Sequence, residues 1–329
     1  MYADKGRSFK ACGTRAPHVA RRSRSREIWA KRGRTMGESN VKKMAVIGAG
    51  QMGRGIAQVA AVTGIHVVLS DVELSVAEKA KATIGGLLAR LVEKGKLDKD
   101  AEAATLARIT PAKSGEHLDD CEIAVEAATE HVETKIAILR AVDQKLPAKA
   151  ILASNTSSIS ITKLAAVTKR ADRVIGMHFM NPVPVMKLCE IVRGVQTSPE
   201  TYATTAALAK RMGKEIITSN DHPGFMVNRI LIPLLNEAAL ALMEGVGTAE
   251  DIDKGAKLGL NHPMGPLELA DLIGLDTVLA IGEVLHREIG DPKYRAPTNL
   301  KNLVAAGWLG RKTGRGFYRY DDKGGRVAG

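Results

Sequence analysis

The sequence of 329 residues predicts an α/β protein, in which a Rossmann-type, mostly parallel sheet domain is followed by a smaller all-α domain. Three observations lead to this prediction. Short apolar runs alternate with helical patterns between residues 43 and 217, a glycine-rich turn joins the first run to the first helix, and only helical patterns follow the Pro-Gly pair at 223–224. We therefore divide the chain into a disordered leader (1–40), a sheet domain (41–220) and a helical domain (221–329).

The predicted strands are short runs rich in Val, Ile, Leu and Ala. Runs that are apolar throughout are typical of parallel strands buried on both faces. We predict strands at 44–47, 66–70, around 109, and at 121–126, 150–153, 173–177, 186–192 and 215–217. Between them, apolar residues recur at helical spacing, which predicts helices at 52–62, 72–93, 99–107, 133–145 and 162–167.

The second half of the chain has a helical pattern only. It begins with a strongly apolar helix at 225–243, which Pro233 is expected to kink because proline removes one main-chain hydrogen bond. Further helices are predicted at 248–258, 266–273, 276–289 and 299–306. The first helix offers more apolar surface than one small domain readily covers, which favours a homodimer formed through residues 222–320.

The positive charge of the chain is concentrated at its start. The net charge is +12, and residues 1–43 contain 13 Lys or Arg against three acidic residues, which leaves +2 for the rest. Aromatic residues make up only 3% of the chain, so the sequence does not favour a nucleic-acid partner, which would need stacking surfaces. No apolar run reaches the ~18 residues of a membrane-spanning helix, so no membrane segment is predicted.

The first 40 residues are dense in Arg, Ser and Gly and show no hydrophobic periodicity, which predicts disorder. Two explanations remain open. The leader is either an Arg-rich transit peptide, which implies the mitochondrial matrix, or sequence upstream of a true start at Met36, which implies a cytoplasmic protein. The scattered cysteines (Cys12, Cys121 and Cys189) fit a reducing compartment, and without a Cys/His cluster no metal site is predicted.

Residues 43–71 contain the most informative motif of the sequence. Gly48, Gly50 and Gly53 have the G-x-G-x-x-G spacing between a predicted strand and a predicted helix. In this motif the first glycine permits a tight turn, the second lets the backbone approach a pyrophosphate, and the third lets helix and strand pack closely. Asp71 follows 23 positions after Gly48, where a carboxylate accepts hydrogen bonds from the adenine ribose. Because this carboxylate would repel a 2′-phosphate, the motif predicts NAD rather than NADP.

Four polar clusters lie outside the glycine motif. They are AVEAATEHVETK at 124–135, SNTSS at 154–158, HFMNPVPVMKLCEI at 178–191 and DHPGFMVNR at 221–229. The first three lie at or near the ends of predicted strands, where open α/β sheets bind their ligands, so we expect them to converge on the cofactor. Simpler interpretations are that Glu126 and Glu130 belong to a solvated turn and that Ser158 is a helix N-cap.

These segments resemble the L-3-hydroxyacyl-CoA dehydrogenase family, in particular its bacterial 3-hydroxybutyryl-CoA dehydrogenase type. The resemblance covers about residues 42–320 and includes GAGQMGRGIAQ, DHPGFMVNRILIPLLNEA, LGLNHPMGPLELADLIGLD and GRKTGRGFYRY besides the second and third clusters. It implies that His178 is the catalytic base, that Glu190 is its partner, and that Ser157 and Asn228 contact an acyl-CoA substrate. The implied cofactor contacts are Gly48, Gly50, Gln51, Met52, Gly53, Asp71, Glu130, Lys135 and Asn155. Lys94 is only a candidate contact to CoA. The resemblance also implies a dimer.

The residue chemistry agrees with the resemblance. Oxidation of a secondary alcohol needs a base for the hydroxyl proton while hydride leaves the same carbon for the nicotinamide, and histidine suits that base because it titrates near neutral pH. A carboxylate on the other ring nitrogen fixes the tautomer and stabilises the imidazolium. Ser157 and Asn228 can hydrogen-bond the oxygen whose charge changes. A short acyl chain is implied by the resemblance alone.

Two rival functions remain. A dehydrogenase of the same superfamily acting on a non-CoA hydroxy acid such as L-gulonate would share the fold and the dyad. A non-catalytic nucleotide-binding protein similar to the lambda-crystallins would be marked by a degraded dyad, whereas His178 and Glu190 are both present. Met180 and Cys189 depart from the family pattern beside the dyad, so they affect the shape of the acyl pocket more than the chemistry. Cys189 itself is expected to be inert packing.

Overall fold

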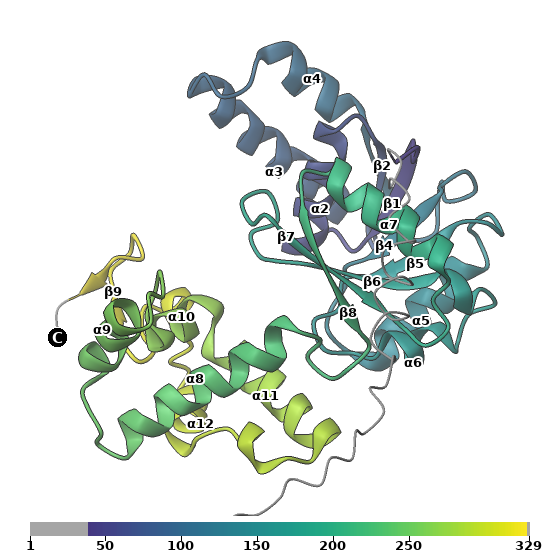
Figure 1. Ribbon diagram of the computed structural model, residues 1–329. Coiled ribbons are helices and arrows are strands. Elements are labelled where there is room, and N and C mark those ends of the chain that lie inside the picture. Colours follow the sequence, from purple (N-terminus) through teal and green to yellow (C-terminus); the bar gives the residue numbers. More distant parts are fainter. Residues whose placement is uncertain (1–38, 328–329) are drawn as a thin grey trace, which may run out of the picture. The chain divides into compact units, whose positions relative to one another are not determined.

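The computed structural model describes residues 39–327 (Figure 1). The predictions for the leader, including the start at Met36, lie outside these residues. Eight strands form one sheet: β1 (Lys43–Ile47), β2 (His66–Asp71), β3 (Ile109–Lys113), β4 (Ile123–Glu126), β5 (Ile151–Ser154), β6 (Val174–Phe179), β7 (Leu188–Arg193) and β8 (Glu215–Asn220). The helices among them are α2 (Gln51–Val62), α3 (Leu74–Glu93), α4 (Lys99–Ala107), α5 (Val132–Asp143), α6 (Ile161–Ala165) and α7 (Pro199–Arg211).

The strand order in the sheet is β3-β2-β1-β4-β5-β6-β7-β8. All neighbouring strands run parallel except β6 and β7, which are antiparallel. The chain first moves outward from β1 to β3 and then returns to place β4 on the other side of β1. A crevice opens at such a switch point, beyond the carboxyl ends of the two central strands. The glycine turn and the 124–135 cluster both lie there.

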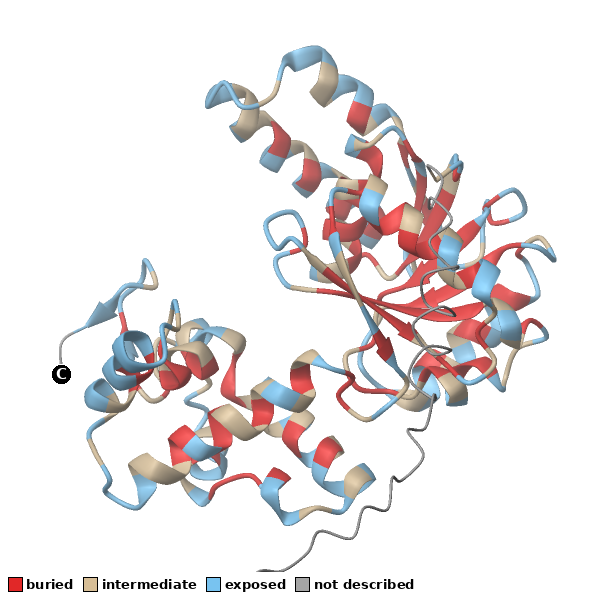
Figure 2. Ribbon diagram, in the orientation of Figure 1, coloured by how far each residue is buried: buried red, intermediate tan, exposed pale blue. Residues whose placement is uncertain are grey.

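The central strands of the sheet are buried on both faces, as the continuous apolar runs predict, whereas the edge strands β3 and β8 are partly exposed. Met44 and Val46 of β1 belong to one core layer, which α2, α3 and α7 cover, whereas Ala45 and Ile47 belong to the other, which α5 and α6 cover. The strands accordingly appear as the most buried part of this domain in Figure 2. The mostly parallel, two-sided sheet predicted from the sequence is thereby confirmed.

A helical domain follows the sheet. Its helices are α8 (Val227–Met243), α9 (Ala249–Gly259), α10 (Pro266–Ile273), α11 (Leu275–Ile289) and α12 (Thr298–Ala305). Pro233 lies inside α8, and the helix continues on both sides of it. The core shared by α8, α10, α11 and α12 includes Ile232, Leu235, Leu275 and Leu285, whereas α9 packs through Ile252 against a second cluster.

Two elements differ from the prediction. The domain is not purely helical, because β9 (Arg319–Tyr320) and β10 (Arg326–Val327) form a two-stranded antiparallel sheet after α12. Asp271 of α10 holds the chain just before and within this sheet, since its carboxylate accepts from the Phe317 and Tyr318 N–H groups and from the Tyr320 hydroxyl, each at 2.9 Å. The sequence interpretation also contained no helix where α7 lies. Within residues 39–327, no helix has the length and apolar character needed to cross a membrane.

Candidate active site

The glycine turn joins β1 to α2 with very little space around it. Gly48 has a φ of 102°, in the left-handed region that favours glycine. A Cβ on Gly53 would lie 1.7 Å from the Gly48 carbonyl oxygen, so only glycine fits there. A Cβ on Gly50, in contrast, would meet nothing within 4 Å. Gly50 is also the N-cap of α2 and provides no side-chain cap, which leaves the helix end open toward a phosphate.

Asp71 ends β2 beside this turn. One carboxylate oxygen accepts from the Ala49 N–H at 2.7 Å and the other from the Val72 N–H at 2.8 Å. Asp71 therefore fixes the shape of the turn, and each oxygen keeps a lone pair for a ribose hydroxyl. Gln51, the first residue of α2, donates from Nε2 to the Asn181 side-chain oxygen at 3.0 Å and so ties the turn to the loop after β6.

His178 and Glu190 form a buried pair on β6 and β7, the sixth and seventh of the eight strands in the sheet order. They are directly opposite each other in the antiparallel register of β6 and β7. His178 Nδ1 lies 3.0 Å from Glu190 Oε2, and the two side chains are 9% and 0% exposed. With Nδ1 on the carboxylate, Nε2 is the ring nitrogen left to exchange a proton with a ligand. The structure therefore brings the predicted base and its predicted partner together.

The segment that leads into α8 closes over this pair. Glu190 Oε1 accepts from the Met226 N–H at 2.7 Å, so both carboxylate oxygens are used. Phe225 has a φ of 52° and its ring packs in a T-shaped arrangement with His178, with the ring centroids 5.9 Å apart. Asn228 donates from Nδ2 to the Ser157 carbonyl oxygen at 3.1 Å, which links α8 to the turn after β5.

The 124–135 cluster is not a solvated turn at Glu126. Glu126 and Lys135 are each 1% exposed, and Lys135 Nζ lies 2.8 Å from Glu126 Oε1. The interpretation of Glu126 as a solvated residue is wrong, because the nearby ammonium neutralises the carboxylate inside the fold. Lys135, an implied cofactor contact, has its ammonium in this buried pair.

Glu130 lies at the surface end of the same network and organises the SNTSS turn. Its Oε1 accepts from the Thr156 hydroxyl at 2.5 Å, from the Ser157 N–H at 2.8 Å and from the Ser158 N–H at 3.1 Å. Burial alone raises the pKa of Glu130, but the Lys135 ammonium and these hydrogen bonds outweigh it, and the pKa is lowered. The carboxylate form is therefore the one that holds the turn.

Three further predicted residues, Asn155, Ser158 and Cys189, lie in or near these strand ends. Asn155 accepts from the Phe179 N–H at 2.9 Å and so joins the ends of β5 and β6. The N-cap of α6 is Ser160, whose hydroxyl accepts from the Lys163 N–H at 3.1 Å, so the N-cap interpretation of Ser158 is wrong. Cys189 is fully buried, and burial raises the pKa of its thiol, as expected for packing.

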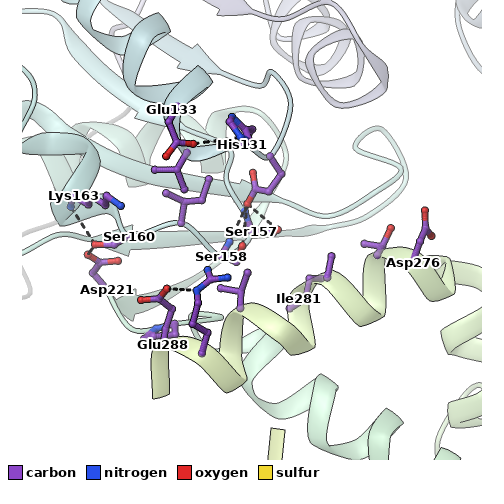
Figure 3. A pocket seen from close by; sticks show the side chains of 18 residues that line it. His131, Glu133, Ser157, Ser158, Ser160, Lys163, Asp221, Asp276, Ile281 and Glu288 are labelled. Carbon is purple, nitrogen blue, oxygen red and sulfur yellow. Dashed lines mark hydrogen bonds and ion pairs between the residues drawn. The ribbon is translucent and has the colours of Figure 1, made fainter. Parts of the chain in front are cut away.

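A pocket of about 750 Å³ adjoins the SNTSS turn (Figure 3). Glu130 and Ser157 line it on the side of the sheet, and Ile281 and Val284 line it from α11. His178 and the three glycines are not part of its lining. The pocket therefore extends from the turn toward α11, away from the glycine motif.

Not every predicted residue joins this arrangement. Lys94 is the exposed C-cap residue of α3, and Met52 lies half-buried in the first turn of α2. The sequence interpretation missed Phe225 and Thr156, which contact His178 and Glu130 respectively. In the described part of the chain, no three or more His, Cys, Asp or Glu side chains gather as a metal would require.

The glycine geometry and Asp71 fit a dinucleotide, because among the three motif glycines only Gly50, where a pyrophosphate would approach, has open space around it. Together with the histidine–carboxylate pair, they define an NAD-dependent dehydrogenase. The family comparison agrees with this class. Residues 43–222 match the model of the 3-hydroxyacyl-CoA dehydrogenase NAD-binding domain, and residues 224–320 match the C-terminal domain of the same family. The chain belongs to the 3-hydroxyacyl-CoA dehydrogenase family.

Individual relatives cover the same region. The chain is 51% identical over 280 residues to a 3-hydroxybutyryl-CoA dehydrogenase of Bradyrhizobium diazoefficiens, which spans 85% of this chain and 96% of the relative. It is 50% identical over 283 residues to a probable 3-hydroxybutyryl-CoA dehydrogenase of Bacillus subtilis, covering 86% and 99% of the two chains. Among solved structures, the (S)-3-hydroxybutyryl-CoA dehydrogenase of Ralstonia eutropha is similar with a TM-score of 0.83 and 53% identity, covering 86% of this chain and 100% of that one.

Proposed function

We propose that this protein interconverts L-3-hydroxyacyl-CoA and 3-ketoacyl-CoA with NAD, and that 3-hydroxybutyryl-CoA is its preferred hydroxy substrate. The observation that carries the proposal is the His178–Glu190 pair, with Nδ1 and Oε2 3.0 Å apart and the ring in contact with Phe225. The names of the relatives at about 50% identity support the short acyl chain.

In the oxidative direction, the glycine turn and Asp71 would hold NAD, which would supply the acceptor for the hydride that leaves the carbinol carbon. His178 Nε2 takes the hydroxyl proton, and the Glu190 carboxylate stabilises the positive charge that forms on the ring. The Ser157 hydroxyl and the Asn228 amide are the proposed donors to the substrate oxygen. The single hydroxyl proton of Ser157, which is directed at Glu130 at 3.1 Å, would turn to the substrate oxygen when the substrate binds, while the Ser157 N–H stays on Glu130. In the reductive direction His178 returns the proton.

The remaining site assignments are proposals of the same kind. We assign the contact to the adenine ribose to Asp71. We assign the contacts at the nicotinamide end to Glu130 and Asn155, because these two residues follow the carboxyl ends of β4 and β5. The buried ammonium of Lys135 supports an indirect role through Glu130. Lys94 stays a candidate for the CoA moiety with no further support.

A substrate panel tests the proposal. Acetoacetyl-CoA, longer 3-ketoacyl-CoAs and L-gulonate are offered with the appropriate nicotinamide form, and NADPH is compared with NADH. We expect NADH-dependent reduction of acetoacetyl-CoA with kcat/KM of about 10⁴–10⁸ M⁻¹s⁻¹. Free CoA should compete with the substrate. Turnover of gulonate without turnover of any acyl-CoA would contradict the proposal.

We also propose a homodimer formed through residues 222–320. Large apolar side chains of the helical domain are exposed, notably Ile230 (69%), Val246 (75%) and Leu258 (78%). We also propose a domain boundary near residue 221. For the location we propose the cytoplasm, with the mitochondrial matrix as the alternative.

A further inference from the structure

Glu126, Lys135 and Ser154 form a buried network beneath the SNTSS turn. Lys135 Nζ lies 2.8 and 2.9 Å from the two Glu126 oxygens. The Ser154 hydroxyl donates to Glu126 Oε2 at 2.6 Å, and the Ala128 N–H donates to Oε1 at 2.7 Å. With four hydrogen bonds and 1% exposure, Glu126 has no free surface toward a ligand.

The network reaches the site through Glu130. Lys135 Nζ lies 3.4 Å from Glu130 Oε2, so one ammonium is shared by two carboxylates. The other Glu130 oxygen accepts from the Ser157 N–H at 2.8 Å and from the Ser157 hydroxyl at 3.1 Å. Lys135 thus holds one carboxylate oxygen of Glu130, and the other Glu130 oxygen holds both the main chain and the side chain of Ser157.

The place of the network in the sheet connects the two halves of the site. In the register of the strands, Ile47 pairs with Glu126 and Glu126 pairs with Ser154. Ile47 directly precedes the glycine turn, and Ser154 opens the SNTSS turn. Glu126 therefore lies between the glycine turn and the SNTSS turn, on β4, the strand that is adjacent to both β1 and β5.

Stability alone does not account for this arrangement. Buried ion pairs often contribute no more to stability than apolar residues of the same volume would, because both charges lose their hydration. Their best-attested benefit is to select one geometry among several. The geometry selected here is the position of Ser157 relative to the strand ends.

We propose that Glu126 and Lys135 are positioning residues of the dehydrogenase reaction, which act through Glu130 to hold Ser157 against the substrate oxygen. The inference rests on the proposed function. It predicts that loss of the network lowers kcat by a larger factor than it raises the KM for NADH, since Asp71 is held by the Ala49 and Val72 N–H groups and not by the network.

The double variant Glu126→Gln/Lys135→Met tests this inference. Lys135→Met alone would leave a buried, unpaired carboxylate and is expected to fold poorly. In the double variant, the glutamine oxygen can accept from the Ala128 N–H and its NH₂ group can donate to the Ser154 hydroxyl oxygen, while methionine fills the space of the lysine chain. The control is Asp143→Asn, which removes the charge from another buried pair of the same domain, in which Arg170 Nε and Asp143 Oδ1 lie 2.6 Å apart with no contact to the turn. Arg170 itself is kept, because it also donates to four main-chain carbonyl oxygens.

Three measurements are made on each folded variant, with thermal unfolding as the check on folding. For the network variant, we expect kcat with acetoacetyl-CoA to fall by about tenfold to a hundredfold, the cost of a small misplacement of a reacting group. The KM for NADH should change by less than about threefold, as expected when only transition-state contacts are lost. Amide hydrogen exchange in the 155–160 segment should be faster by about tenfold, because the Ser157 and Ser158 N–H groups lose a fixed acceptor.

The control variant should retain both kcat and the exchange rate of this segment. A folded network variant with near wild-type kcat would overturn the proposal, and so would a loss of kcat with unchanged exchange. If wild-type protein turned over no acyl-CoA, the proposed function would fail instead, and the exchange measurement would still decide whether the network holds the turn.

Discussion

Replacement of Glu190 by glutamine tests the dyad through the tautomer of His178. In the native site Glu190 Oε1 accepts from the Met226 N–H at 2.7 Å, and Oε2 lies 3.0 Å from His178 Nδ1. A glutamine must keep its oxygen on the Met226 N–H, because its NH₂ group there would face another donor. The NH₂ group then points at Nδ1 and makes that nitrogen an acceptor. The ring proton moves to Nε2, so the nitrogen that should take the substrate proton is already protonated.

The size of the effect follows from the role of the tautomer. An acid-to-amide change behind the histidine of a serine protease triad lowers kcat by about 10⁴, for the same reason. We expect a loss of about 10³–10⁴ here, or about 4–5.5 kcal/mol of transition-state stabilisation. The variant should stay folded, because it keeps the hydrogen bond to Met226 and nearly the same volume.

The assay follows the appearance of NADH from 3-hydroxybutyryl-CoA and NAD, the direction in which Nε2 must accept the proton, in Glu190→Gln, His178→Gln and the double variant. NADH affinity, measured by fluorescence, should be nearly unchanged in all three, since the nucleotide contacts lie on the glycine turn. The double variant should be little worse than the worse single variant, because residues that act as one unit give non-additive losses. Glu190→Gln activity within about tenfold of wild type would refute the tautomer argument.

Four other outcomes are expected. Asp71→Asn, which keeps an acceptor for the turn but removes the charge, should narrow the preference for NADH over NADPH by about tenfold or more, and an unchanged ratio would move the ribose contact elsewhere. Burial raises the pKa of Glu130, but its ion pair and hydrogen bonds lower it overall, so its stabilising contribution is full above the ordinary glutamate pKa and is lost as the pH falls through the lower folded value. The difference in Tm between wild type and Glu130→Gln should therefore be largest near neutral pH and should approach zero in acid. A difference in Tm that does not change with pH would contradict this. Tyr320→Phe removes the 2.9 Å hydrogen bond to buried Asp271 and should cost about 1–3 kcal/mol in urea unfolding, whereas no loss would show that the contact is dispensable. Light scattering should report a dimer at micromolar concentration, and a monomer would contradict the proposed interface in 222–320.

The sequence predicted the sheet well because its strands are buried on both faces and therefore apolar throughout. The sequence pattern did not reveal α7, because the buried face of this helix is not apolar throughout. The buried face of α7 includes Thr201 and Thr205, both 0% exposed, so the polar hydroxyls interrupt the apolar period. The local signal was a capping one, with Ser198 as N-cap and Pro199 at the first helical position. The β9–β10 pair escaped prediction because its anchor, Asp271, is distant in sequence.

The interacting residues of the site could be predicted where both lie in one sequence segment, and could not be predicted where they come from different helices and strands. His178 and Glu190 lie twelve positions apart in one strand pair. The burial of Glu126 depends on Lys135, which arrives from α5, and no local pattern distinguishes such a carboxylate from an exposed one. Phe225 contacts His178 only because its backbone adopts a positive φ that few phenylalanines have.

The direct pairing of His178 with Glu190 across β6 and β7 makes the dyad sensitive to changes in chain length. Side chains alternate between the faces of a sheet, so a slip of β7 by one residue would place Cys189 or Ile191 opposite His178 and turn Glu190 to the other core layer. A buried carboxylate would then lie among apolar side chains. Insertions and deletions in the 180–187 connection are therefore expected to be tolerated far less than substitutions, and this loop is a poor place for tags, grafts or loop exchange between homologous enzymes.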